Sequence, residues 1–155
     1  MIYRRASPED AGAISRLIVS FLKEFTVDPN GTGAETFIAS VSAEAEKTYI
    51  LSDHYDYWIA ETSDGVAGFI AIQDKKHIFH LFVAPQYQRQ GLARVLWQMA
   101  RDAAAPHNVA REFTVNSSLL AVPVYERFGF ERASAPIEKN GISFIRMRHV
   151  NDDAG

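Results

Sequence analysis

Residues 83–94 read Val-Ala-Pro-Gln-Tyr-Gln-Arg-Gln-Gly-Leu-Ala-Arg. An apolar run precedes this stretch and a periodic helical pattern follows it, which predicts a strand, a tight loop and a helix N-terminus. Pro85 ends the strand because it has no N–H to donate to a sheet, and Gly91 lets the backbone approach a ligand closely. Unpaired N–H groups and the helix dipole favour a phosphate at such a junction. Arg89 and Arg94 add positive charge.

The residue pattern of this stretch is more specific than that of a generic phosphate-binding loop. The Gly-Lys-Ser/Thr ending of a Walker loop is missing, and only one of the three glycines of a dinucleotide-binding loop is present. Val-x-Pro followed by Gln-x-x-Gly-x-Ala resembles instead the acyl-CoA-binding motif of the GNAT (Gcn5-related) N-acetyltransferases, with Gln88, Gly91 and Ala93 at the motif positions. Residues 121–130 resemble the family's Ala-x-x-x-Tyr-x-x-x-Gly-Phe segment, which places Tyr125 at its tyrosine.

Length and composition bound the class of protein. The 155 residues predict a single domain, residues 1–150, followed by a short tail, residues 151–155. A hydrophobic content of 47% and a charged content of 23% are typical of a soluble globular protein. The chain has no cysteine, which excludes disulfides, thiol catalysis and cysteine-ligated metals. No apolar run approaches the roughly 20 residues of a membrane span, so we expect a cytoplasmic protein without a membrane partner.

The net charge of −3 is unevenly distributed. Residues 1–64 hold 11 acidic and 5 basic side chains, whereas residues 65–155 hold 8 acidic and 11 basic ones. The basic half suits the phosphates of CoA, and the acidic half could attract a cationic amine. The alternative is that both halves are solvated surfaces. No basic stripe is interleaved with aromatic residues, so no nucleic-acid partner is expected.

The hydrophobic patterns predict an α+β fold. We expect a mixed, mostly antiparallel sheet of about seven strands flanked by four helices, in the order β-α-α-β-β-β-α-β-α-β-β. The first two helices are expected from Ser7 to Phe25 and from Ala34 to about Tyr49. The final strand, residues 143–148, is expected to offer an edge at which a homodimer could form. The GNAT resemblance implies the same order of elements.

The resemblance implies transfer of an acetyl group from acetyl-CoA to a primary amine of a small molecule or peptide, by direct attack in a ternary complex and without a metal. It places the pantetheine arm between the strands that precede the two motifs. A backbone N–H near Phe82 or Val83 is implied to polarise the thioester carbonyl. Asn116 and Ser118 are alternatives for binding the pantetheine amides. The residues implied in binding acetyl-CoA are Leu81, Phe82, Val83, Gln88, Arg89, Gln90, Gly91, Leu92, Ala93, Arg94, Asn116 and Ser118.

The resemblance also implies catalytic roles. Tyr125 matches the general acid that protonates the departing thiolate, a group with a pKa near about 8.5. His77 is a candidate base because some members carry Glu or His at its position. His80 is an alternative base that strict alternation turns to the opposite face unless a bulge shifts the register; ordered water is a third option.

The fold does not decide between activities. A non-catalytic acyl-CoA-binding or regulatory module is the alternative function, and a nucleotide-phosphate binder is a third. The region expected to receive the amine, residues 25–56, carries no motif that identifies its acceptor.

Overall fold

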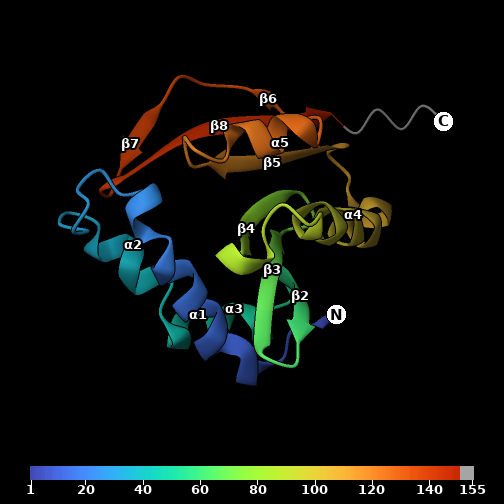
Figure 1. The fold of residues 1–155 in the computed structure, drawn as a ribbon. Helices are drawn as coiled ribbons and strands as arrows, with labels where there is room; N and C mark the ends of the chain where they lie inside the picture. The colour runs from blue at the N-terminus through green and yellow to red at the C-terminus, as the bar shows by residue number, and fades with distance from the viewer. Residues whose placement is uncertain (151–155) are drawn as a thin grey trace.

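The computed structural model describes residues 1–150 of the chain; the expected tail lies outside the described residues. The strands are β1 (Ile2–Arg5), β2 (Tyr55–Thr62), β3 (Gly65–Gln73), β4 (His77–Val83), β5 (Glu112–Ser117), β6 (Glu131–Arg132), β7 (Ile137–Lys139) and β8 (Ile142–Val150). The α-helices are α1 (Ala11–Ser20), α2 (Glu35–Ser40), α3 (Ala43–Leu51), α4 (Leu92–Ala104) and α5 (Val122–Arg127) (Figure 1). The mixed α+β class predicted from the sequence is confirmed.

The eight-stranded sheet is interrupted at its centre. Its strand order is β1-β2-β3-β4-β5-β8-β6, with β7 paired to β8. Every pairing is antiparallel except the one between β4 and β5, which holds only at His77 with Thr114 and Ile78 with Val115. Residues 80–83 of β4 pair with β3 alone. The two central strands therefore separate beyond Ile78, and a wedge-shaped opening divides the sheet.

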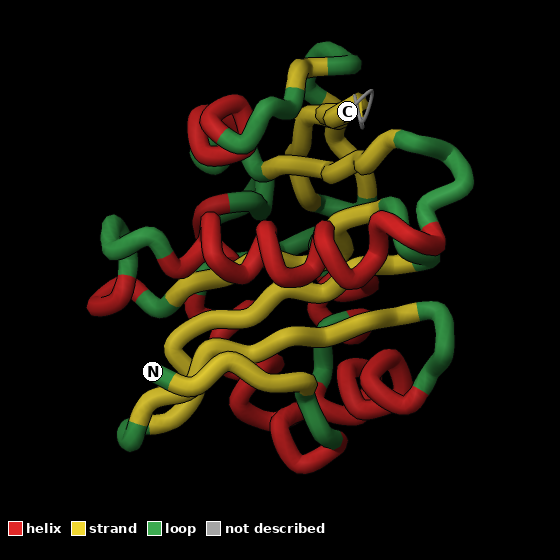
Figure 2. The backbone as a smooth tube through the Cα atoms, turned by 90° about the vertical axis from the view of Figure 1, so that its right-hand side faces the viewer, coloured by secondary structure: helices red, strands yellow, loops and turns green. Residues whose placement is uncertain are grey.

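Helices cover the two faces of the sheet separately. The long helix α4 crosses one face, in front of the strands in Figure 2, while α1 and α3 lie against the other (Figure 1). Helix α4 buries an apolar stripe against the sheet, with Trp97 packed edge-on to Phe113 at 5.1 Å between ring centroids. Ile14 and Ile18 of α1 are fully buried against β2 and β3. Each face thus has its own apolar core.

A β-bulge in β4 changes which side chains share a face. Ala71 of β3 pairs with His80, but the next residue, Ile72, pairs with Ile78, so Phe79 is an extra residue. Phe79 and His80 consequently both lie on the α1/α3 side, where the His80 ring is 5.8 Å from that of Phe69. His80 is therefore on the same face as His77, as expected if a bulge replaces strict alternation.

Three details differ from the sequence predictions. The sheet has eight strands rather than about seven, because β7 is an additional short strand before β8. The expected helix from Ala34 to Tyr49 is two helices, because Ser42 has an extended backbone and its side chain accepts a hydrogen bond from the N–H of Ala45, which starts α3. The final strand is not a free edge. β8 pairs with β5 on one side and with β6 and β7 on the other, so the edges of the described sheet are β1, β6 and β7.

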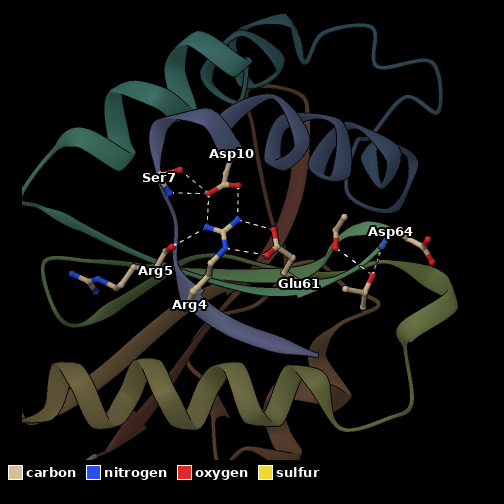
Figure 3. Close-up of polar contacts among 8 residues, drawn as sticks. Arg4, Arg5, Ser7, Asp10, Glu61 and Asp64 are labelled. Atoms are coloured by element: carbon tan, nitrogen blue, oxygen red, sulfur yellow. Dashed lines mark hydrogen bonds and ion pairs between the residues drawn. The ribbon is translucent and has the colours of Figure 1, made fainter.

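The first strand is fixed to the first helix by one arginine. The Arg4 guanidinium donates to both carboxylate oxygens of Asp10, at 2.8 and 2.9 Å, and to Oε2 of Glu61 at 2.9 Å (Figure 3). Asp10 also accepts a hydrogen bond from the N–H of Ser7, which closes the helix start predicted there. The arginine holds the pKa of Asp10 and that of Glu61 below their ordinary values. This cluster ties β1, β2 and the start of α1 together.

The far end of the wedge is bridged by two loops. The N–H of Val27 donates to the carbonyl of Gly141, and the N–H of Ser143 donates to the carbonyl of Phe25, each at 2.9 Å. The β7–β8 turn therefore lies on the loop between α1 and α2, consistent with the position of β7 beside α2 in Figure 1. A Cβ at Gly141 would overlap the backbone of Gly33, so this contact needs glycine.

Candidate active site

One cavity runs through the opening between β4 and β5. Its volume is about 1220 Å³, and its walls come from β4, β5, the loop after β4, both ends of α5 and the segment around α1 and α2. Pockets that hold one drug-sized ligand have volumes of roughly 300–1,000 Å³. This cavity is therefore larger than a pocket for one drug-sized ligand.

The loop from Ala84 to Gly91, called the donor loop below, ends in a helix N-terminus that is open to a ligand. Gly91 precedes α4 with a φ of 84° and provides no side-chain cap. The first bond of the helix runs from the N–H of Val95 to the carbonyl of Gly91 at 3.1 Å, which leaves the preceding N–H groups without helical partners. A Cβ built on Gly91 meets nothing within 4 Å. The donor set therefore fits the phosphates of an acyl-CoA.

Polar side chains fix the donor loop in place and give this end of the cavity a positive charge. Gln88 donates from Nε2 to the carbonyl of Val83 at 2.9 Å, which fixes the donor loop to the end of β4. Arg94 lies over the ring of Phe128, 5.3 Å from its centroid, and donates to the carbonyl of Arg127 at 3.4 Å. Arg127 also lines the cavity, and sequence analysis missed it although it follows Tyr125 within the second motif.

The structure brings most of the predicted site residues to this cavity. Those that line it are His77, His80, Leu81, Phe82, Val83, Gln88, Arg89, Gly91, Leu92, Ala93, Arg94, Asn116, Ser118 and Tyr125. Gln90 is not among the lining residues. Its side chain is exposed and donates to the carbonyl of Gln86 at 3.2 Å.

Tyr125 lies on α5 at the donor side of the cavity. Only 6% of its surface is exposed, and its ring packs against Phe130 with 5.7 Å between centroids. Its hydroxyl has no hydrogen-bond partner among residues 1–150. Burial raises the pKa of this hydroxyl above its ordinary value, so it keeps its proton at neutral pH and can donate it to a group in the cavity.

His80 is hydrogen-bonded to the carboxylate of Glu46, a residue that sequence analysis did not identify as part of the site. Its Nε2 lies 3.0 Å from Oε2 of Glu46, and the hydroxyl of Tyr57 donates to Oε1 of the same carboxylate at 2.6 Å. Glu46 is fully buried, and His80 is 6% exposed. Burial next to this carboxylate raises the pKa of Tyr57, which therefore acts only as a donor. The imidazole is fixed through one nitrogen, and His80 is among the residues that line the cavity.

His77 lies at the closed end of the opening. Its Nδ1 is 2.7 Å from Oγ1 of Thr114 on the neighbouring strand. Burial, followed by the charge of Lys76 and the nearby His80, lowers the pKa of His77, so its neutral form is favoured.

Asn116 and Ser118 occupy different environments. The Ser118 hydroxyl accepts a hydrogen bond from the N–H of Ala121 at 3.2 Å, just before α5. Asn116 is exposed on β5, and within the described chain no hydrogen bond involves its side-chain amide. The part of the chain that the structure describes holds no group of three metal-ligating side chains, and no helix in it is both long and apolar enough to cross a bilayer.

A sheet that opens between two parallel strands above a phosphate-suited helix N-terminus is the architecture of the acyl-CoA N-acyltransferases. Comparison with known proteins agrees, because residues 25–150 match the acetyltransferase (GNAT) domain model. The chain therefore belongs to the GNAT family.

Individual relatives are more distant. The chain is 30% identical over 116 residues to a Mus musculus protein named "Probable N-acetyltransferase family 8 member 5", and the match covers 66% of this chain and 50% of that one. It is 27% identical over 103 residues to human N-acetyltransferase 8, covering 58% and 44% of the two chains. The chain thus spans about half the length of these relatives.

Solved structures share the fold over nearly the whole chain. A GCN5-related N-acetyltransferase from Rhodopseudomonas palustris superimposes with a TM-score of 0.79 at 19% identity, covering 96% of this chain and 94% of that one. The PaiA N-acetyltransferase of Thermoplasma acidophilum, solved in complex with coenzyme A, gives a TM-score of 0.71 at 17% identity, covering 96% and 98%.

Proposed function

We propose that the chain transfers the acetyl group of acetyl-CoA to a primary amine, by direct attack while both substrates are bound. The observation that carries this proposal is the single cavity that joins the donor loop, the buried Tyr125 hydroxyl and the His80 imidazole. A shared cavity favours direct attack because no side chain has to carry the acetyl group between two sites. Membership of the GNAT family supports the same reaction.

The donor would enter through the opening between β4 and β5. Its phosphates would lie on the N–H groups at the start of α4, with Arg89, Arg94 and Arg127 balancing their charge. The pantetheine amides would lie between the separated strands. Asn116 suits these amides better than Ser118, because the hydroxyl of Ser118 already accepts a hydrogen bond at the start of α5.

Bound acetyl-CoA supplies the acetyl group as a thioester. The backbone N–H of Val83, on the unpaired side of β4, would donate to the carbonyl oxygen and stabilise negative charge there. The N–H of Phe82 faces β3, because the N–H of Ala84 donates to the carbonyl of Ala67 and N–H groups alternate in direction along a strand. Tyr125 would donate its proton to the sulfur as the carbon–sulfur bond breaks. CoA would then leave as a neutral thiol. The second proton that the nitrogen loses as the amide forms would pass to solvent, from which the tyrosine is reprotonated.

The attacking amine must first lose a proton. We assign that step to His80 rather than to His77. Glu46 orients the His80 ring through Nε2, whereas Nδ1 of His77 is engaged by Thr114 and burial opposes protonation of His77. The bulge at Phe79 is what turns His80 towards this side of the cavity.

The test is release of free CoA thiol from acetyl-CoA across a panel of primary amines, with the acetylated product identified by mass spectrometry. Amine-dependent thiol release is expected. CoA binding without turnover on any amine would support the non-catalytic module instead, and strong competition by ATP against CoA would indicate a nucleotide-phosphate site.

We also propose that the protein is cytoplasmic and that it forms a homodimer. The first rests on the use of acetyl-CoA as donor. The second concerns the edges β1, β6 and β7, since β8 is paired on both sides; sedimentation velocity over a concentration series would test it.

A further inference from the structure

The side of the cavity away from the donor loop has a distinct chemistry. Five phenylalanines line it, and we call them the aromatic wall: Phe21, Phe25, Phe37, Phe79 and Phe82. Four of these five pack on the α1/α3 face of the sheet, away from α4. The wall therefore lies on the opposite side of the opening from the core beneath the donor loop.

Four rings of the wall are in mutual contact, and His80 links the fifth, Phe79, to Phe82. Phe82 lies 5.6 Å from Phe21 and 6.3 Å from Phe25, and Phe25 meets Phe37 edge-on at 5.2 Å between centroids. All five side chains are only partly buried. Rings that face a cavity and remain partly exposed favour an apolar or aromatic ligand group, because its binding would remove their surface from water.

The aromatic wall extends to His80, the proposed base. The ring of Phe79 is 4.2 Å and that of Phe82 is 6.0 Å from the His80 imidazole. An amine whose nitrogen approaches His80 would therefore place the rest of its structure against phenylalanine rings. The rings also attract an ammonium group through their π faces before it is deprotonated.

Carboxylates are scarce around the cavity. Among the described residues that line it, Glu24 is the one acidic side chain, and the arginines all belong to the donor loop, α4 and α5. A polyamine or an amino sugar with several ammonium groups would need several carboxylates to replace its hydration. The lining thus suits one positive charge and an apolar body.

We infer that the acceptor is an arylalkylamine, a primary amine joined by a short alkyl chain to an aromatic ring. This inference rests on the proposed acetyl transfer. The aromatic ring would lie on Phe21, Phe25 and Phe37, and the amine nitrogen would lie next to His80.

The experiment compares 2-phenylethylamine, n-propylamine and spermidine as acceptors in the thiol-release assay. The value of kcat/KM is expected to be at least ten-fold higher for 2-phenylethylamine than for the other two, since one well-buried apolar group already discriminates ten-fold or more. Phe37→Ala should lower kcat/KM for 2-phenylethylamine at least ten-fold and for n-propylamine less than three-fold. Phe25→Leu, which keeps an apolar side chain, should act in the same direction with a smaller effect. Val19→Ala, at an exposed position of α1 outside the cavity lining, is the matched control.

Equal or better turnover of n-propylamine or spermidine would overturn the inference while the proposed function stands. Equal losses for both monoamines in the phenylalanine variants would also overturn it. If no amine is acetylated, the proposed function fails, and calorimetric titration of the CoA-saturated protein decides the inference separately. Binding of 2-phenylethylamine at least ten-fold tighter than n-propylamine would support it, and equal binding would overturn it.

Discussion

Nε2 of His80 lies 3.0 Å from Oε2 of Glu46, a carboxylate with no exposed surface. The two residues come from β4 and α3 and are 34 positions apart in the chain. A buried carboxylate is costly unless it is hydrogen-bonded, and here His80 and Tyr57 each bond one of its oxygens. The arrangement orients the imidazole at the acceptor side of the cavity.

Replacing this pair should change the rate more than the affinity for CoA. His80→Gln is expected to lower kcat about 100-fold at pH 7, because general-base catalysis contributes that order of rate. Glu46→Gln keeps the side-chain volume but removes the carboxylate that orients the imidazole, so it should lower kcat about ten-fold. His107→Gln, at an exposed turn after α4, is the control. A His80→Gln variant with wild-type kcat would favour ordered water as the base.

Tyr125→Phe should lower kcat by about 100-fold while the Kd for CoA changes less than three-fold. The variant removes only the hydroxyl, and the packing against Phe130 remains. Calorimetry of CoA binding and the thiol-release assay measure the two quantities. Tyr3→Phe, on β1 and outside the cavity lining, controls for loss of a tyrosine hydroxyl. Unchanged kcat in Tyr125→Phe would rule out its role as the acid.

Gly91→Ala should weaken CoA binding at least ten-fold. The φ of 84° would cost alanine about 1 kcal/mol of stability, and its methyl group would enter the open space where the phosphate is expected. Gly33→Ala is a close match, with a φ of 89° and equally open surroundings, but it lies outside the cavity lining. Both variants should lose similar stability in urea unfolding, and only Gly91→Ala should lose CoA affinity. Equal CoA affinities would argue against phosphate binding at α4.

His77 should make the protein less stable in mild acid. Its pKa is lowered in the folded state, mainly by burial, so the unfolded chain binds the proton first, near its ordinary pKa of about 6.5. The free energy of unfolding is therefore highest above that pH and falls as the pH drops through 6.5 towards the folded pKa. Urea unfolding between pH 5 and 7.5 should show a shallower pH dependence in His77→Gln than in the wild type. Parallel curves would contradict the assignment.

The Arg4 cluster should contribute in a different pH range. The pKa values of Asp10 and Glu61 are lowered, so their stabilisation is present above the ordinary carboxylate pKa of about 4 and is lost as the pH falls through the folded values. Arg4→Met is expected to reduce the free energy of unfolding at pH 7 by about 1 kcal/mol, as for a partly exposed bidentate pair. The difference between variant and wild type should shrink towards pH 2.5. A difference that stays constant with pH would assign the loss to packing.

The sequence predicted the strand–loop–helix unit from β4 to α4 better than the opposite wall of the cavity, because this unit depends on local signals. Pro85, Gly91 and the apolar stripe of α4 all lie within one strand–loop–helix unit. The break at Ser42 was missed, although a serine followed by Glu44 in the next turn is a recognisable helix start.

The role of Glu46, in contrast, could not be predicted from the sequence. Its pairing with His80 depends on the position of a bulge and on how α3 docks against the sheet, and neither follows from local spacing. The aromatic wall likewise comes from three separate segments that only the tertiary fold brings together.

The interruption between β4 and β5 has one further consequence. A sheet normally satisfies its own amide groups, yet here the chain leaves residues 79–83 of β4 without a neighbour on one side, in the interior of the molecule. An extended molecule with amides of its own would complete the ladder. Bound CoA would therefore occupy the place of a missing strand, and it would be part of the structure as well as a reactant. Thermal stability should therefore depend on the concentration of CoA as it would on that of a structural partner.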